Sequence, residues 1–288
     1  MTASARAHAA VRRAVREHDE NFPVAFLLLP REQREAMHAI YAFCRATDDL
    51  GDEGAPDRAA RLARLDAWER DVHTAWGGAP DDPRLAALAI AVDRFELPLG
   101  RFLRLIEANR MDQRQDRWDT YEDLLRYCRH SATPVGEMVL AVLGYRDAWR
   151  IGLSDHTCIG LQLINFWQDI ARDLADRGRV YLPREDMDRF GVDDGDLARP
   201  PASPAARELV AFEVDRARAH LREGGPLARL VPARARLDLR MFTAGGLALC
   251  DAVAEAGYDT VSGRPAPGAL GRGRIAGGAA WGMIRGRA

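Results

Sequence analysis

Lysine is absent from this sequence: all 41 basic residues are arginines, set against 43 acidic residues. This usage is typical of a GC-rich coding bias, although the planar guanidinium of arginine also suits bidentate contacts with phosphate groups. The formal net charge of −2 and a pI of about 6.4 leave no excess of positive charge for a nucleic-acid backbone. We therefore expect no nucleic-acid partner.

Cysteine is scarce as well. The four cysteines are widely separated and form no Cys-x-x-Cys motif, so neither a zinc site nor a disulfide scaffold is predicted. The seven histidines show no metal-ligand spacing. A nicotinamide cofactor is not predicted, because no Gly-x-Gly-x-x-Gly motif follows a predicted strand.

Long hydrophobic runs are also missing. The longest, such as residues 24–29, are far shorter than the roughly 18 residues that a membrane span needs. The first residues do not have the pattern of a signal peptide. Together with the cysteine usage, these observations predict a cytoplasmic protein.

Apolar residues instead recur with the 3.6-residue period of helices, among strong helix formers, and no segment alternates as a strand does. A hydrophobic content of 47% over 288 residues is enough for one large core. We therefore predict an all-α protein. The expected helices span residues 4–18, 31–52, 57–76, 82–95, 98–109, 119–130, 134–144, 147–175, 204–223 and 227–256.

Residues 1–262 are expected to form one domain. The breaks at residues 77–80 and 200–204 end helices but do not read as domain linkers. Residues 263–288 are rich in glycine, alanine and arginine and are predicted to form a C-terminal tail. Two interpretations of this tail remain open, a loosely ordered extension and a basic surface anchor on anionic lipid.

Two acidic clusters about 120 residues apart carry the clearest functional signal. Each has two aspartates four residues apart, Asp48 with Asp52 and Asp169 with Asp173. This spacing puts both carboxylates of a pair on one helix face. Like charges about 4 Å apart cost on the order of 4 kcal/mol at an effective dielectric of about 20, so such pairs favour a bound cation. Mg²⁺ binds carboxylate and phosphate oxygens together, which points to a phosphorylated substrate.

Further polar residues accompany both pairs along the predicted helices. They lie beside the apolar stripe on residues 31–52, and the same arrangement recurs on residues 147–175. These polar positions are Tyr41, Arg45, Asp48 and Asp52 on the first helix, and Gln162, Asn165, Asp169 and Asp173 on the second. Two such helices are suited to forming opposite walls of one cavity.

Other interpretations of the acidic residues were weighed. Either cluster alone is typical of a solvated helix end whose acids pair with local arginines, whereas the two together argue against that. An EF-hand calcium loop is excluded at its best candidate, which begins at Asp186, because Phe190 and Leu197 occupy its fifth and twelfth positions.

Three segments in correct order and spacing, residues 41–52, 161–173 and 178–183, resemble the squalene and phytoene synthase family. The similarity runs from about His18 to Tyr258, which is nearly the whole chain. The resemblance implies a single-domain isoprenoid synthase fold in which helices surround a central cavity.

Within that family the chain most resembles the bacterial hydroxysqualene synthases of hopanoid biosynthesis, on residues 20–23, 127–136 and 165–169. Many squalene and phytoene synthases have serines shortly after the position that matches His18. This chain has Asp19 and Asn21 there. This difference from the family pattern argues against the conventional condensation of two prenyl diphosphates.

The resemblance implies a role for each matching residue. Mg²⁺, or Mn²⁺ as an alternative, would be held by Asp48, Asp52, Asn165, Asp169 and Asp173. Substrate-binding residues would be Arg45, Arg179, Gln162 and Asn165 at the polar end, with Val135, Gly136 and Val139 along the prenyl tunnel. The residues near the reacting carbons or the leaving group would be Tyr127, Tyr41, Asp112 and Arg45.

Taken without the resemblance, several of these residues have simpler interpretations. Tyr41 and Tyr127 would be core-edge residues of amphipathic helices whose hydroxyls bond locally. Arg179 would be a solvated loop residue. Asp112 would form a surface ion pair with a neighbouring arginine, of little energetic consequence.

The implied chemistry is ionisation of a prenyl diphosphate. Once the diphosphate leaves, a carbocation remains in an apolar, water-poor cavity, where aromatic faces and tyrosine oxygens stabilise it without trapping it. The leading prediction is that presqualene diphosphate ionises, rearranges and is captured by water as hydroxysqualene. One alternative is head-to-head condensation of two farnesyl or geranylgeranyl diphosphates to squalene, dehydrosqualene or phytoene. The other is a noncatalytic helical scaffold.

The expected partner is therefore a prenyl diphosphate. Because such substrates and products partition into lipid, the expectation extends to peripheral contact with the inner face of the membrane. Association with other enzymes of squalene and hopanoid biosynthesis is a further expectation.

Overall fold

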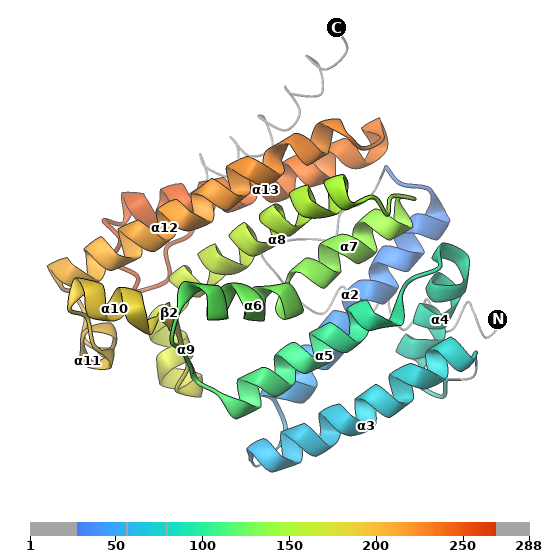
Figure 1. The fold of residues 1–288 in the computed structure, drawn as a ribbon, viewed down its shortest axis with the longest axis horizontal. Coiled ribbons are helices and arrows are strands. Elements are labelled where there is room, and N and C mark those ends of the chain that lie inside the picture. Colours follow the sequence, from blue (N-terminus) through green and yellow to red (C-terminus); the bar gives the residue numbers. More distant parts are fainter. Residues whose placement is uncertain (1–27, 56, 79, 269–288) are drawn as a thin grey trace, which may run out of the picture. The chain divides into compact units, whose positions relative to one another are not determined.

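A computed structural model describes residues 28–268, apart from residues 56 and 79, and shows helices with one small sheet (Figure 1). The expected helix over residues 4–18, the segment 18–23 and most of the predicted tail lie outside the described residues. Within the described ranges, no helix is long and apolar enough to cross a membrane.

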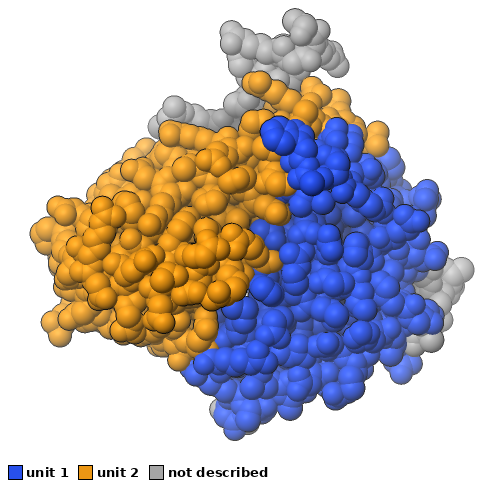
Figure 2. All heavy atoms as spheres, viewed as in Figure 1, with its two compact units in different colours: residues 1–114, 130–151 blue, residues 115–129, 152–288 orange. Residues whose placement is uncertain are grey.

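The chain forms two compact units, coloured separately in Figure 2. Among the described residues, unit 1 contains residues 28–114 and 130–151, and unit 2 contains residues 115–129 and 152–268. Neither unit is one continuous stretch of sequence.

Unit 1 is built around its first described helix. Its elements are α2 (Arg31–Asp52), α3 (Arg58–Gly77), α4 (Pro83–Phe95), α5 (Leu99–Arg114) and α7 (Thr133–Val142). Helix α2 packs against the other four. Phe43 of α2 stacks on Trp68 of α3 at 5.9 Å between ring centroids and meets Phe102 of α5 edge-on at 5.0 Å. This aromatic core packs α3 and α5 against α2.

Unit 2 contains most of α6 (Tyr121–Ser131) and α8 (Ala148–Gln168). Its other elements are β1 (Arg117–Trp118), α9 (Ile170–Arg177), β2 (Val180–Pro183), α10 (Arg184–Phe190), α11 (Asp194–Ala198), α12 (Pro204–Gly224), the 3₁₀ helix η1 (Gly225–Arg229) and α13 (Ala233–Glu255).

Two glycines allow the long helices of unit 2 to approach closely, and α12 and α13 lie side by side in Figure 1. A methyl group on Gly160 of α8 would lie 2.7 Å from Cγ of Leu221 on α12. One on Gly246 of α13 would lie 2.8 Å from Cδ2 of the same leucine. Any larger residue at either position would push these helices apart.

The expected helix over residues 147–175 is wrong in one respect, because it is two helices. Helix α8 ends at Gln168, Asp169 is the N-cap of α9 with φ −103° and ψ 11°, and α9 begins at Ile170. The apolar stripe continues through the break, since Phe166 and Ile170 are both buried. The periodicity therefore gave no sign of the interruption.

The last expected helix, over residues 227–256, also begins too early. Pro232 is the N-cap of α13, and η1 precedes it, because a proline cannot donate the backbone hydrogen bond of a helix interior. The expected helix over residues 98–109 ends five residues too early, because α5 continues to Arg114. The other expected helices that fall among the described residues agree with the structure to within two residues at each end.

The prediction of no strands is wrong in detail, and two short helices, α10 and α11, were missed. Strands β1 and β2 pair in parallel, with Arg117 opposite Val180 and Trp118 opposite Pro183. At two and four residues, and with all of β2 buried, they are too short to show alternation.

A buried acid network holds α10 against α12. Glu213 is fully buried, and the Arg216 guanidinium donates to Glu213 Oε1 at 3.0 Å and to Asp186 Oδ2 at 2.6 Å. Burial raises the pKa of Glu213 to about 8, opposed by the charge of Arg216. Asp186, the first residue of the excluded EF-hand candidate, is thus part of the core.

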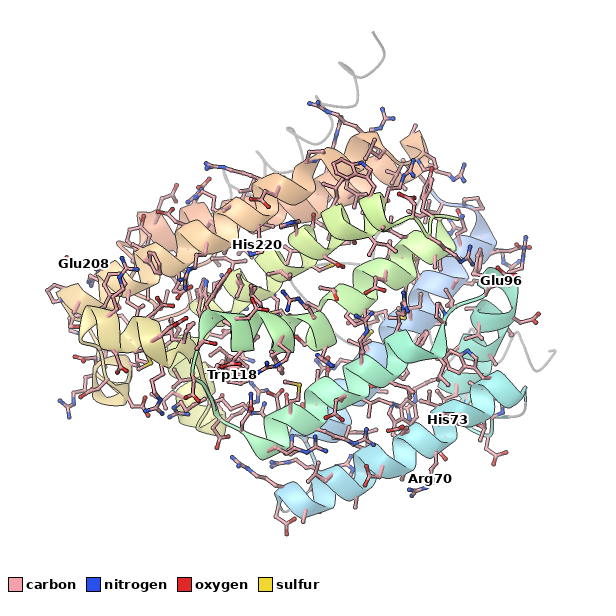
Figure 3. All side chains as sticks on the ribbon, in the orientation of Figure 1. Arg70, His73, Glu96, Trp118, Glu208 and His220 are labelled. Atoms are coloured by element: carbon pink, nitrogen blue, oxygen red, sulfur yellow. The ribbon has the colours of Figure 1, made fainter. Side chains whose placement is uncertain are left out.

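We expect the stability of the protein to fall as the pH rises from about 5 to 8. The folded state then keeps a proton on Glu213 that the unfolded chain has released, so the folded state loses on the order of a few kcal/mol across this window. Glu213→Gln should flatten the dependence in urea titrations at pH 5, 6, 7 and 8. Glu208→Gln, on an exposed position of α12 (Figure 3), should leave it unchanged. An unaltered slope in Glu213→Gln would show that another group is responsible.

Candidate active site

The first acidic pair lies on the last turns of α2, and α5 supports it. Asn109 donates through Nδ2 to Asp48 Oδ1 at 3.2 Å, and Gln113 donates through Nε2 to the Gly51 carbonyl at 3.0 Å. A methyl group on Gly51 would lie 2.2 Å from Asn109 Oδ1, so glycine is what allows Asn109 to reach Asp48. The chain from Asp48 to Asp52 is therefore held by buried amides.

Asn109 and Gln113 were not predicted as site residues. Their signal in the sequence is their spacing around Asp112, since positions 109, 112 and 113 share one face of α5. The structure buries all three. Burial of Asp112 contradicts its interpretation as a surface ion pair.

The other candidates of unit 1 lie on α2 and α7, which pack together. Tyr41 is half-buried, as are Val135 and Val139, which are one turn apart on α7 beside the buried Gly136. The Arg45 guanidinium lies 2.9 Å from Asp49 Oδ1, one turn along its own helix.

The second acidic pair begins at the break between α8 and α9. The Asp169 carboxylate makes no capping bond to α9. Both of its oxygens instead accept from Arg264, Oδ1 from Nε at 2.7 Å and Oδ2 from Nη2 at 3.1 Å. Arg172 lies farther from Oδ1, at 3.5 Å. The interruption of the helix thus turns this carboxylate toward a cation from elsewhere in unit 2.

One turn further along, Asp173 is buried at the start of α9. Burial raises its pKa to about 6, Arg177 at 3.1 Å lowers it, and the charge of Asp169 raises it. On α8, the Asn165 Oδ1 atom is buried and accepts no hydrogen bond from any described residue. Two oxygens of this motif therefore remain without full compensation by the protein.

This arrangement fits a hard divalent cation. The buried Asn165 Oδ1 atom has no hydrogen-bond donor among the described residues, and burial disfavours the charged form of the Asp173 carboxylate. An added positive charge would stabilise both oxygens. Asp169, in the same motif, also supplies only oxygen donors, and so do Asp48 and Asp52 of the first motif on α2. Within residues 28–268 no group of three or more His, Cys, Asp or Glu side chains gathers as metal ligands.

Arg179 follows the second motif directly and is 5% exposed. Gly178, with φ 67°, ends α9 in the left-handed conformation, and the chain turns there into β2. The Arg179 amide donates to the Asp173 carbonyl at 3.1 Å. These contacts contradict the interpretation of Arg179 as a solvated loop residue and fix it beside the acidic pair.

Tyr127 of α6 is buried among aromatic rings of unit 2. Its ring centroid lies 5.2 Å from that of Trp118, 5.7 Å from Tyr181 and 6.1 Å from Phe166. Gln162, by contrast, is only half-buried on α8. The interpretation of Tyr127 as a residue at the edge of the core is therefore wrong, because it lies inside an aromatic cluster.

A hollow of about 390 Å³ in unit 2 is lined by β1, β2, α10 and α11, including Arg117, Trp118 and Asp194. None of the predicted site residues lines it. We assign it no role in the chemistry.

Arg264 is the contact that sequence reasoning missed, because residues from 263 onward were assigned to a tail. The segment after α13 is anchored by Asp259, which accepts from Arg207 at 2.7 Å and from the Ser262 hydroxyl at 2.8 Å. That anchor places Arg264 against Asp169, 95 residues earlier in the sequence.

We expect Arg264→Gln to tighten binding of Mn²⁺ to the substrate-free protein by about five-fold. The partly exposed ion pair that a metal must displace is worth about 1 kcal/mol. Titration followed by electron paramagnetic resonance measures the affinity. Arg172→Gln, with its longer contact to Asp169, should change it less. An unchanged or weaker affinity for Arg264→Gln would show that the arginine does not compete with the ion.

The chain belongs to the squalene/phytoene synthase family, whose model matches residues 15–270. Enzymes of this family act on prenyl diphosphates and depend on divalent metal ions. The predicted all-α isoprenoid synthase fold is thereby confirmed.

Relatives with different reactions are similarly close. A 15-cis-phytoene synthase of Synechococcus elongatus is 35% identical over 219 residues, covering 72% of this chain and 70% of the relative. A hydroxysqualene synthase of Rhodopseudomonas palustris is 35% identical over 211 residues, covering 73% and 70%. The crystal structure of the squalene synthase HpnC from Alicyclobacillus acidocaldarius has a TM-score of 0.82 and 45% identity, covering 88% of this chain and 95% of that one.

Proposed function

We propose that this enzyme converts presqualene diphosphate to hydroxysqualene and diphosphate. The carbon–oxygen bond to the diphosphate breaks, and the cyclopropylcarbinyl cation rearranges to the 1-1' linked skeleton. Water then adds and releases a proton. The observation that carries this proposal is the aromatic surround of Tyr127, together with the similarity to HpnC and to a hydroxysqualene synthase.

Five oxygen donors would serve the substrate diphosphate through divalent ions. They are Asp48, Asp52, Asn165, Asp169 and Asp173. A bound Mg²⁺ or Mn²⁺ ion would neutralise charge on the departing diphosphate. The unpartnered Asn165 Oδ1 and the raised pKa of Asp173 support this assignment on α8 and α9.

Two arginines and an amide would complete recognition of the diphosphate. Arg179 is buried beside the second acidic pair, so its charge acts where little solvent screens it. Arg45, paired with Asp49, would exchange that partner for phosphate oxygens. Gln162 would donate from the polar side of α8.

The apolar part of the site would bind the prenyl chains and shield the cation. Tyr127, Tyr41 and Asp112 would lie near the reacting carbons or the leaving group. Val135, Gly136 and Val139 would border the prenyl tunnel. Exclusion of bulk water restricts capture to a positioned molecule.

A second candidate function is head-to-head condensation of two farnesyl or geranylgeranyl diphosphates, and the phytoene synthase relatives favour it. Purified enzyme with Mg²⁺ should be given presqualene, farnesyl or geranylgeranyl diphosphate separately. The proposal predicts turnover of presqualene diphosphate alone. Condensation of farnesyl or geranylgeranyl diphosphate would replace it with the second candidate.

We also propose that the enzyme is cytoplasmic and that it contacts the inner face of the membrane peripherally. Substrate and product are both lipophilic, so transfer to and from a bilayer, or to other enzymes of squalene and hopanoid biosynthesis, avoids passage through water. Flotation with anionic vesicles tests the membrane contact directly.

A further inference from the structure

Four buried aromatic rings from four separate elements meet in unit 2. Trp118 is on β1, Tyr127 on α6, Phe166 on α8 and Tyr181 on β2. Trp118, labelled in Figure 3, is almost completely buried at 1% exposure. The small sheet brings its two aromatic residues together, although 63 positions separate them in the sequence.

Tyr181 is at the centre of this cluster. Its ring stacks on Phe166 at 3.8 Å between centroids with the planes 8° apart, and on Trp118 at 4.5 Å with the planes 24° apart. Tyr127 packs against the same column, tilted by 39° to Tyr181 and edge-on to Trp118. The column therefore forms the surface against which the Tyr127 ring rests.

The same column connects elements that carry other site residues. Phe166 directly follows Asn165 on α8, and Tyr181 is two residues after Arg179 on the segment that becomes β2. A shift of the Tyr181 ring would thus be transmitted to Asn165 and Arg179, which are assigned to the diphosphate, and to Tyr127, which is assigned to the cation. Interiors packed this closely transmit displacement rather than absorb it.

We propose that Tyr181 is a positioning residue that, held between Phe166 and Trp118, fixes the ring of Tyr127 and so determines how the carbocation is quenched. This inference rests on the proposed function, in which Tyr127 faces the reacting carbons. The stacked ring of Tyr181 carries the role, because both of its neighbours contact its faces. Tyr181→Phe should therefore preserve it.

The test compares Tyr181→Phe and Tyr181→Leu with wild type. On presqualene diphosphate with Mg²⁺, Tyr181→Phe should keep kcat within about three-fold and the same product distribution. Tyr181→Leu should lose kcat by about 30-fold, since displacement of a positioned group by about 1 Å costs up to about 100-fold. Hydroxysqualene should give way to hydrocarbons and isomeric alcohols.

Phe102→Leu in unit 1 is the matched control. Phe102 is fully buried between Phe43 and Trp76, so this variant loses a comparable amount of aromatic packing elsewhere. It should lower Tm without changing the product distribution. If Tyr181→Leu does not fold, Phe166→Leu removes one face of the same column and is used in its place.

Unchanged products in a folded Tyr181→Leu or Phe166→Leu enzyme would overturn the proposal, as would the same product shift in Phe102→Leu. Failure of the proposed function would give a different result from failure of the positioning role. In that case wild type consumes farnesyl diphosphate instead, and the same variants are compared on that substrate. A product shift confined to the column would still assign the positioning role to Tyr181.

Discussion

Replacing Asp169 with asparagine is expected to lower kcat on the prenyl diphosphate substrate by about 10³-fold or more. The change keeps the size of the side chain but removes the charge that a divalent ion requires, at the position where α8 breaks into α9. Mn²⁺ affinity of the substrate-free protein should fall in parallel. Steady-state turnover and electron paramagnetic resonance titration measure the two effects.

The matched control is Asp176→Asn, two turns later in the same stretch of chain. Asp176 is exposed on α9 and its nearest arginine contact, with Arg172, is 3.9 Å long. Turnover and Mn²⁺ affinity should both remain within about two-fold of wild type. Full activity in Asp169→Asn would contradict the metal role of this carboxylate.

Asp48→Asn is expected to have the second large effect, a loss of about 10²- to 10³-fold in kcat. The double variant Asp48→Asn with Asp169→Asn tests the cause of that loss. If both aspartates serve one diphosphate, the double variant should be no worse than the poorer single variant, since groups that act as a unit are not additive. Presteady-state single-turnover rates measure the chemical step.

Multiplied losses in the double variant would contradict the assignment of both motifs to one diphosphate. Glu53→Gln serves as the control, because Glu53 is exposed and immediately follows Asp52. It should retain wild-type turnover. The Tm of Glu53→Gln should also equal that of the wild type. This control therefore distinguishes the loss of a metal ligand from a general weakening of the end of α2.

Much of the fold could be predicted from periodicity alone. Helix α2 matches its expected bounds, because its apolar stripe is long and Pro30 marks its start. The break at Asp169 could not be predicted, since the hydrophobic stripe continues through Phe166 and Ile170. Nor could β1 and β2, because pairing between residues 117 and 180 is a tertiary contact with no local signal.

The candidate site, like the fold, could be predicted from the sequence only in part. Acidic pairs at four-residue spacing are visible in the sequence, and so is the polar row that contains Asn165. The contact of Arg264 with Asp169 was not visible, because it joins positions 95 residues apart through an anchored loop. The aromatic column around Tyr181 depends likewise on the small sheet, so local patterns did not reveal it.

The fate of the carbocation is the central claim, and oxygen labelling tests it most directly. Purified enzyme, Mg²⁺ and presqualene diphosphate are incubated in water enriched in ¹⁸O, and products are separated and analysed by mass spectrometry. The account predicts hydroxysqualene that carries one ¹⁸O atom from solvent. Recovery of unchanged presqualene diphosphate, or of hydrocarbon without oxygen, would contradict it.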